Sequence, residues 1–177
     1  MRANWNPGDI IILKLNEDLY SCALMSKVKN YLKYFLHFEK SDCFDIMEIM
    51  KIEPEFCTAE LGVVKHLGCR KIKIKHSEKF DNSIPEFWIR PNLGGPGRAF
   101  KGGDLVRCNP DTGPDPLDPI VKPDLNPSSD IEIINKYELT NFMDYETIRK
   151  RLILCHKMGK NVDPLKESIF DIDISKT

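Results

Sequence analysis

The sequence has no long apolar run and no excess of charge of either sign, and these two absences exclude broad classes of protein. The first apolar run, from Ile10 to Leu13, is four residues long, too short for a signal peptide. No stretch approaches the roughly 18 apolar residues that a membrane span needs. Basic and acidic residues nearly cancel, 26 against 27, so the overall charge indicates neither a nucleic-acid nor a membrane partner. We therefore expect a soluble cytoplasmic protein with no membrane partner.

Closely spaced metal ligands and known catalytic motifs are also missing. The six cysteines and four histidines are scattered, and the only near pairs are His66 with Cys69 and Cys155 with His156. Structural zinc sites normally present two ligands from one tight turn. The glycine-rich stretch at 94–97 lacks the lysine and hydroxyl residue of a phosphate loop, and no G-x-S-x-G or H-E-x-x-H motif occurs. We predict reduced, mostly buried thiols, no metal, no cofactor and no enzymatic activity.

What the sequence does contain is a set of short strand patterns near its N-terminus. Apolar residues make up 41% of the 177 residues, enough for one core. Residues 10–15, 19–25 and 31–38 are rich in β-branched and aromatic side chains, and short polar links join them, which predicts an antiparallel meander. Further strands are predicted at 56–64, 71–75, 85–91 and 104–108.

Helix signals are fewer. The segment 144–156 predicts a helix, with Asp144 as its N-cap and Gly159 just past its end. The segment 41–50 predicts one or two helical turns capped by Ser41 or Asp42. The alternating segment 169–174 predicts an edge strand or a loose tail.

Six prolines between Pro110 and Pro127 predict an extended connector, because proline supplies no backbone donor. We expect a β-rich body at 1–108 and a connector at 109–130 that is packed on the body or tethered to it. A helix and tail at 131–177 would belong to the same domain. The predicted fold class is α+β, with a mainly antiparallel, twisted, partly barrel-like sheet and one C-terminal helix.

Charge is segregated along the chain even though it cancels overall. The window from Glu39 to Glu60 holds seven acidic residues against two lysines. Such separation suits a protein partner with a basic face, although an ordinary solvated surface has the same pattern. Within this window, Asp42, Asp45 and Glu48 are our candidate partner-binding residues.

A second cluster is basic. Strict alternation in the segment 71–75 places Lys71, Lys73 and Lys75 on one face of a strand. That face could bind phosphates while Trp88 or Tyr31 stacks on a base, or it could be a solvated edge that prevents strand pairing between molecules.

Three segments resemble the bacterial immunity protein 26 family. The opening residues 8–25, with a Gly-Asp pair before an apolar strand and then an aromatic residue among small ones, look like the start of that family. Residues 67–88 are similar to its middle section, and residues 141–152 resemble its terminal helix. The resemblance implies a small β-rich, partly barrel-like body with a helix. It also implies a role as antidote to a toxin that bacteria use against competitors, and it carries no catalytic residues.

Our leading hypothesis from the sequence is an immunity protein that blocks the active site of a cognate toxin domain. A toxin that attacks nucleic acids needs a basic cleft, so Asp42, Asp45 and Glu48 would mimic phosphate charge in such a nuclease. The alternative is a nucleic-acid-binding β-barrel module that uses the lysine-lined face. An enzyme of unrecognised type is a third hypothesis.

Overall fold

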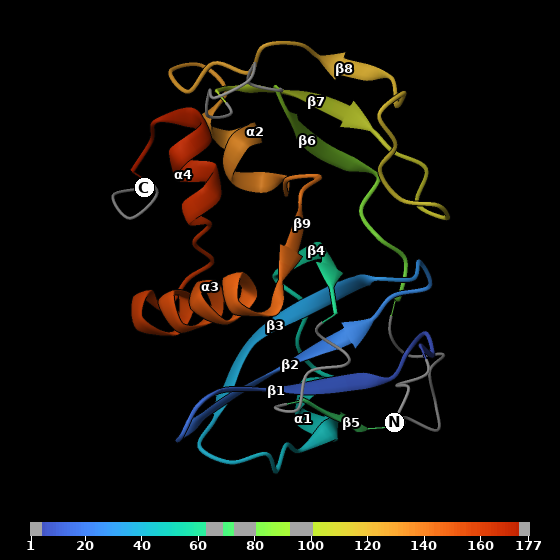
Figure 1. Cartoon of the computed structure of the whole chain (residues 1–177), viewed down its shortest axis with the longest axis vertical. Helices are drawn as coiled ribbons and strands as arrows, with labels where there is room; N and C mark the ends of the chain where they lie inside the picture. Colours follow the sequence, from blue (N-terminus) through green and yellow to red (C-terminus); the bar gives the residue numbers. More distant parts are fainter. Residues whose placement is uncertain (1–4, 63–68, 73–80, 93–100, 174–177) are drawn as a thin grey trace. The chain divides into compact units, whose positions relative to one another are not determined.

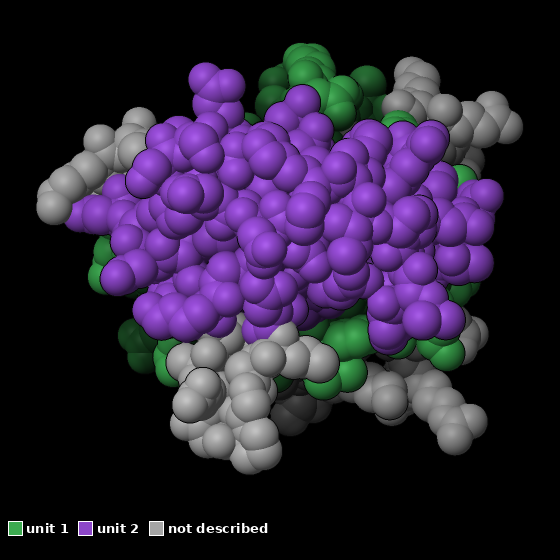
Figure 2. Space-filling view, turned by 90° about the horizontal axis from the view of Figure 1, so that it is seen from above, with its two compact units in different colours: residues 1–84, 142–161 green, residues 85–141, 162–177 purple. Residues whose placement is uncertain are grey.

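The computed structural model describes residues 5–62, 69–72, 81–92 and 101–173 (Figure 1). The chain forms two compact units, which Figure 2 distinguishes by colour. Unit 1 comprises residues 1–84 and 142–161, and unit 2 comprises residues 85–141 and 162–177. The chain therefore passes from one unit to the other three times. The sequence-based division at residues 108 and 130 stays a prediction.

Unit 1 is built on a six-stranded sheet in the order β5-β1-β2-β3-β4-β9. The strands are β1 (Ile10–Asn16), β2 (Leu19–Met25), β3 (Tyr31–Glu39), β4 (Phe56–Leu61), β5 (Cys69–Ile72) and β9 (Phe142–Asp144). All neighbours pair antiparallel except β4 and β9, which are parallel. The predicted α+β class and mainly antiparallel sheet are thus confirmed, but the sheet is open, with β5 and β9 as its outer strands.

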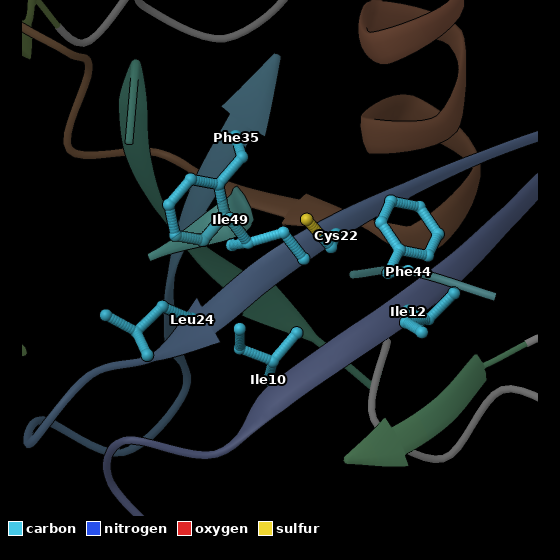
Figure 3. Packing of buried hydrophobic residues seen from close by; sticks show 7 residues of the cluster. All are labelled: Ile10, Ile12, Cys22, Leu24, Phe35, Phe44 and Ile49. Atoms are coloured by element: carbon cyan, nitrogen blue, oxygen red, sulfur yellow. The ribbon is translucent and has the colours of Figure 1, made fainter. Parts of the chain in front are cut away.

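Both faces of the central strands are buried. One face carries the cluster in Figure 3, where Phe44 and Ile49, from the segment around α1 (Ile46–Ile49), pack on side chains of β1, β2 and β3. On the other face, Tyr34 stacks on Phe56 at 4.8 Å between ring centroids, and the guanidinium of Arg151 lies 3.9 Å from the Phe56 ring centroid. Because Tyr34 and Phe35 are consecutive strand residues, they point to opposite faces. Therefore α1 and α3 (Tyr145–Met158), which carries Arg151, cover opposite sides of this sheet.

The helix α3 confirms the prediction for the segment 144–156. The Asp144 carboxylate accepts a hydrogen bond from the Thr147 backbone N–H at 2.8 Å, which is an N-cap. Gly159 ends the helix at φ 66°, a left-handed conformation that glycine adopts without steric cost. Arg149 also donates to the Leu15 carbonyl oxygen at 2.7 Å, which ties α3 to the end of β1.

Unit 2 contains a three-stranded antiparallel sheet in the order β6-β7-β8 and two short helices. Its elements are β6 (Phe87–Pro91), β7 (Gly103–Arg107), β8 (Ile120–Lys122), α2 (Ile131–Lys136) and α4 (Pro164–Phe170). One core joins β6, β7, α2 and α4, and it is made of Ile89, Leu105, Leu125, Ile134, Leu139, Ile169 and Phe170. The strand β8 lies within the proline-rich segment and occupies the edge of the sheet, where missing backbone donors are tolerated.

The prediction of a strand or loose tail at 169–174 is wrong for residues 169 and 170, which belong to α4. Asp163 caps this helix by accepting from the Leu165 backbone N–H at 3.0 Å, and Pro164 fits the first helical turn. Leu165 and Ile169 lie four residues apart, so a helix brings both onto the unit 2 core. The alternation in the sequence begins only where this helix ends.

An ion pair in unit 2, between the buried carboxylate of Asp130 and the half-exposed ammonium of Lys122, makes its stability depend on pH. The Asp130 carboxylate lies 2.5 Å from the Lys122 ammonium and accepts from the Asn126 backbone N–H at 3.0 Å. The hydrogen bond from Lys122, followed by that from Asn126, holds the pKa of Asp130 below its ordinary value. A lowered pKa in the folded state adds stability above the unfolded-state value, and this stability is lost as the pH falls through the folded value.

We therefore expect Asp130→Asn to lower the free energy of unfolding at neutral pH and to flatten its decline between about pH 5 and pH 3. Urea unfolding at several pH values measures both effects. Glu132→Gln, at an exposed site in the first turn of α2, is the matched control and should leave the pH profile close to that of the wild type. An unchanged profile for Asp130→Asn would contradict a stabilising role for the pair.

Candidate partner-binding surface

The helix α1 begins at a later residue than the sequence predicts. The expected caps were Ser41 or Asp42, but Asp45 is the N-cap, and its carboxylate accepts from the Met47 backbone N–H at 2.8 Å. The chain has left the sheet at Glu39, the end of β3, and the side chain of Phe44, just before this cap, is buried in the cluster on the sheet. Only the residues after it are free to form the helical turn.

The core contacts of α1 also decide which side chains face solvent. Ile49 is fully buried in the cluster of Figure 3, and Ile46 packs against that cluster. Helical geometry then directs Met47 and Glu48 away from the sheet. Met47 has 61% of its surface exposed, although it is a large apolar residue.

The structure places the three predicted site residues in one segment, and each also has a local structural partner. Asp42 pairs with Arg70 of β5, with 3.0 Å between Oδ2 and Nε. Glu48 pairs with Lys51 at 2.6 Å, and this hydrogen bond raises the pKa of Lys51. Exposed pairs of this kind contribute little to stability, so they orient the carboxylates more than they stabilise the fold.

The structure adds residues that the sequence-based choice did not include. Glu53 and Glu55 are exposed in the loop between α1 and β4, and they form no ion pair with another described residue. Ile52, in the same loop, is 37% exposed. By contrast, Glu60 is buried on β4 and adds no charge to the surface. The alternation of charged and apolar residues from 51 to 55 was visible in the sequence, but its exposure was not.

We define the acidic α1 surface as the exposed or half-exposed side chains of Asp42, Asp45, Met47, Glu48, Ile52, Glu53 and Glu55. Along the chain, carboxylates precede and follow the two exposed apolar residues, and the exposed Lys51 lies between them. This combination is typical of a surface that binds another protein, because apolar contacts supply binding energy and charges select the partner.

Comparison with known proteins places the chain in one family. Residues 1–174 match a family described as a domain of unknown function, DUF8309. The chain belongs to the DUF8309 family. No curated protein and no solved structure matches it. The resemblance to the immunity protein 26 family stays a prediction.

Of the three lysines that form the predicted lysine-lined face of this DUF8309 chain, the structure describes Lys71. Its ammonium lies 2.7 Å from the Asp9 carboxylate, and both side chains are mostly buried. Lys73 and Lys75 lie outside the described residues. The lysine that is described is therefore engaged within the protein, where it joins β5 to the start of β1.

The remaining candidates from the sequence are the glycine-rich stretch and the near pairs of metal-binding residues. The glycine-rich stretch 94–97 and His66 lie outside the part of the chain that the structure describes. Within that part, no group of three or more metal-binding side chains occurs, and no helix has the length and apolar character to cross a membrane. Among the described thiols, those of Cys22, Cys57, Cys108 and Cys155 are buried, as predicted for most of the cysteines, and that of Cys43 is exposed.

The N-cap role of Asp45 can be separated from its charge. We expect Asp45→Ala to lower the free energy of unfolding by about 1 kcal/mol, because the Met47 N–H loses its acceptor. Asp45→Asn keeps a side-chain oxygen and should stay within a few tenths of a kcal/mol of the wild type. Urea unfolding of both variants measures the difference. Equal loss in both would mean that the charge matters for stability and the cap does not.

Proposed function

We propose that this protein is a non-catalytic immunity protein of the bacterial cytoplasm, which neutralises a cognate toxin by covering its active site. The single observation that carries the proposal is the acidic α1 surface, where Met47 and Ile52 are exposed among carboxylates. A surface of this kind complements a basic cleft with an apolar floor. A cleft that holds nucleic-acid phosphates has the required charge, so the favoured toxin is a nuclease.

The anchoring of α1 supports this proposal. A binding surface gains affinity when its side chains are held before the partner arrives, because less conformational entropy is lost on binding. Ile49 and Phe44 fix the segment to the sheet, while the Asp42 and Glu48 ion pairs orient two carboxylates. The surface is therefore largely preorganised.

The cap and the ion pairs also determine how the proposal must be tested. Lysine replacements would remove the cap at Asp45 and repel Arg70 from Asp42, so they would disturb the local fold as well as the charge. The isosteric set Asp42→Asn, Asp45→Asn and Glu48→Gln removes three charges and keeps one acceptor oxygen on each side chain.

We expect this triple variant to bind the toxin domain encoded beside its gene at least about tenfold more slowly at low salt, with a weaker equilibrium affinity. Surface plasmon resonance across a salt series measures the association rate and the equilibrium affinity. Rescue of cell growth on co-expression measures whether the toxin is neutralised. The matched control Glu17→Gln, Asp18→Asn and Glu132→Gln removes three charges from exposed sites elsewhere and should bind as the wild type does. Unchanged binding by the α1 variant would exclude this surface, and absence of wild-type binding would contradict the proposal.

The nucleic-acid alternative makes a different prediction. A phosphate-binding face should bind oligonucleotides with an affinity that falls steeply as salt rises. Because Lys71 is already paired with Asp9, we expect no measurable binding of single-stranded or double-stranded oligonucleotides in fluorescence anisotropy at ordinary ionic strength. Salt-sensitive binding that is lost in a Lys73→Gln, Lys75→Gln variant would instead favour the alternative.

A further inference from the structure

The methionines of this chain differ widely in their exposure to solvent. Met47, in α1, has 61% of its surface exposed, and Met158, at the end of α3, has 41%. Met50 is half-buried, whereas Met25 and Met143 are buried in unit 1. Among the described methionines, Met47 is therefore the one that a dissolved oxidant reaches most easily.

The exposure of Met47 follows from the way α1 is anchored. Ile49 is fully buried in the sheet core, and Ile46 packs against the same cluster, so these two isoleucines define the inner face of the helix. Successive helix residues are rotated by about 100°, which turns Met47 to the outer face. A chemical change at the end of the Met47 side chain therefore leaves the anchoring contacts of α1 intact.

A peroxide oxidises an accessible thioether without help from a cofactor. A lone pair on the Met47 sulfur attacks one oxygen of hydrogen peroxide, the O–O bond breaks, and an S–O bond forms. The sulfur loses two electrons and becomes a sulfoxide, while the second peroxide oxygen leaves as water with both protons. The same change at Met25 or Met143 would place a polar oxygen in a buried environment, which costs free energy. We therefore expect the exposed methionines to react first.

Oxidation would change what the acidic α1 surface presents to a partner. Met47 and Ile52 are the two exposed apolar residues of this surface. A sulfoxide oxygen accepts hydrogen bonds, so burying it in an apolar contact without a donor costs free energy. The sulfoxide is neutral, and the charge of the surface stays the same. The effect should therefore fall on the dissociation rate and leave electrostatic steering of association unchanged.

We propose that Met47 is a sulfoxidation site, at which a peroxide weakens the binding of the acidic α1 surface to its toxin. The proposal rests on the proposed function and adds a regulation of the same surface. The modification is reversible, because a methionine sulfoxide reductase regenerates the thioether while two thiols form a disulfide and one water is released.

Peptide mass spectrometry after treatment with hydrogen peroxide tests the order of oxidation. All comparisons use a Cys43→Ala background, because Cys43 is an exposed thiol that peroxide also oxidises. Met47 and Met158 should carry sulfoxide before Met25 and Met143 do. Protein oxidised at Met47 should unfold at the same urea concentration as untreated protein, because this side chain is exposed. Oxidation of a buried methionine ahead of Met47 would overturn the proposal.

Binding is then measured by surface plasmon resonance, with the toxin domain encoded beside the gene as the probe and the peroxide removed beforehand. Oxidation of the Cys43→Ala protein should weaken its affinity about tenfold or more, mainly through faster dissociation. Treatment with methionine sulfoxide reductase and dithiothreitol should restore the affinity.

Two variants in the same background assign the effect to one sulfur. Met47→Leu should have the same affinity before and after treatment, whatever that affinity is, because it has no thioether at this position. Met158→Leu, at the exposed site at the end of α3, is the matched control. It should bind as the Cys43→Ala protein does and should lose affinity on oxidation to the same extent.

The outcomes separate this proposal from the proposed function. If untreated protein binds and protein oxidised at Met47 binds equally well, regulation at Met47 is overturned and the proposed function stands. A loss of affinity that persists in Met47→Leu, or that disappears in Met158→Leu, also overturns it. If untreated protein does not bind the toxin, the proposed function fails, and regulation at Met47 fails with it.

Discussion

Burial of both faces of the β1-β2-β3 meander is the constraint on which the rest of unit 1 depends. Residues 10–13 are all buried, so consecutive side chains on opposite faces of β1 both need cover. The segment around α1 covers one face with Phe44 and Ile49, and α3 covers the other, where Arg151 lies on the Phe56 ring. A sheet with one apolar face and one polar face would need a covering layer on its apolar face only. In such a sheet α1 would not have to be anchored to the second face.

The same anchoring determines what the molecule presents to a partner. Because Ile49 must face the core, helical geometry turns Met47 and Glu48 outward, and the cap at Asp45 places a carboxylate beside them. The acidic residues therefore serve two purposes: they complete local hydrogen bonds and they set the charge of the surface. A neutral isostere at these positions removes the charge and keeps the local hydrogen bond, whereas a charge reversal changes both. Neutral isosteres therefore separate the effect on binding from the effect on folding.

Sequence patterns predicted the elements whose signals are local. The strands of the meander were predicted from runs of β-branched and aromatic residues joined by short polar links, and α3 was predicted from the Asp144 cap and Gly159. Each of these signals is read within a few residues. Residues 169 and 170 were assigned to an edge strand or loose tail because the alternation at 169–174 was weighed without Asp163 and Pro164, which begin a helix just before them. The cap of α1 was misplaced because the burial of Phe44 depends on strands that are distant in sequence.

By itself, the sequence determined the α+β class, the meander, the terminal helix and the segregation of acidic from basic residues, since each follows from neighbours along the chain. Only the tertiary structure decided which charged and apolar side chains a partner can reach. Glu60 is buried and Lys71 is paired with Asp9, whereas Met47 and Leu117 are exposed. Exposure and pairing depend on contacts between residues far apart in sequence, and local patterns carry no information about those contacts.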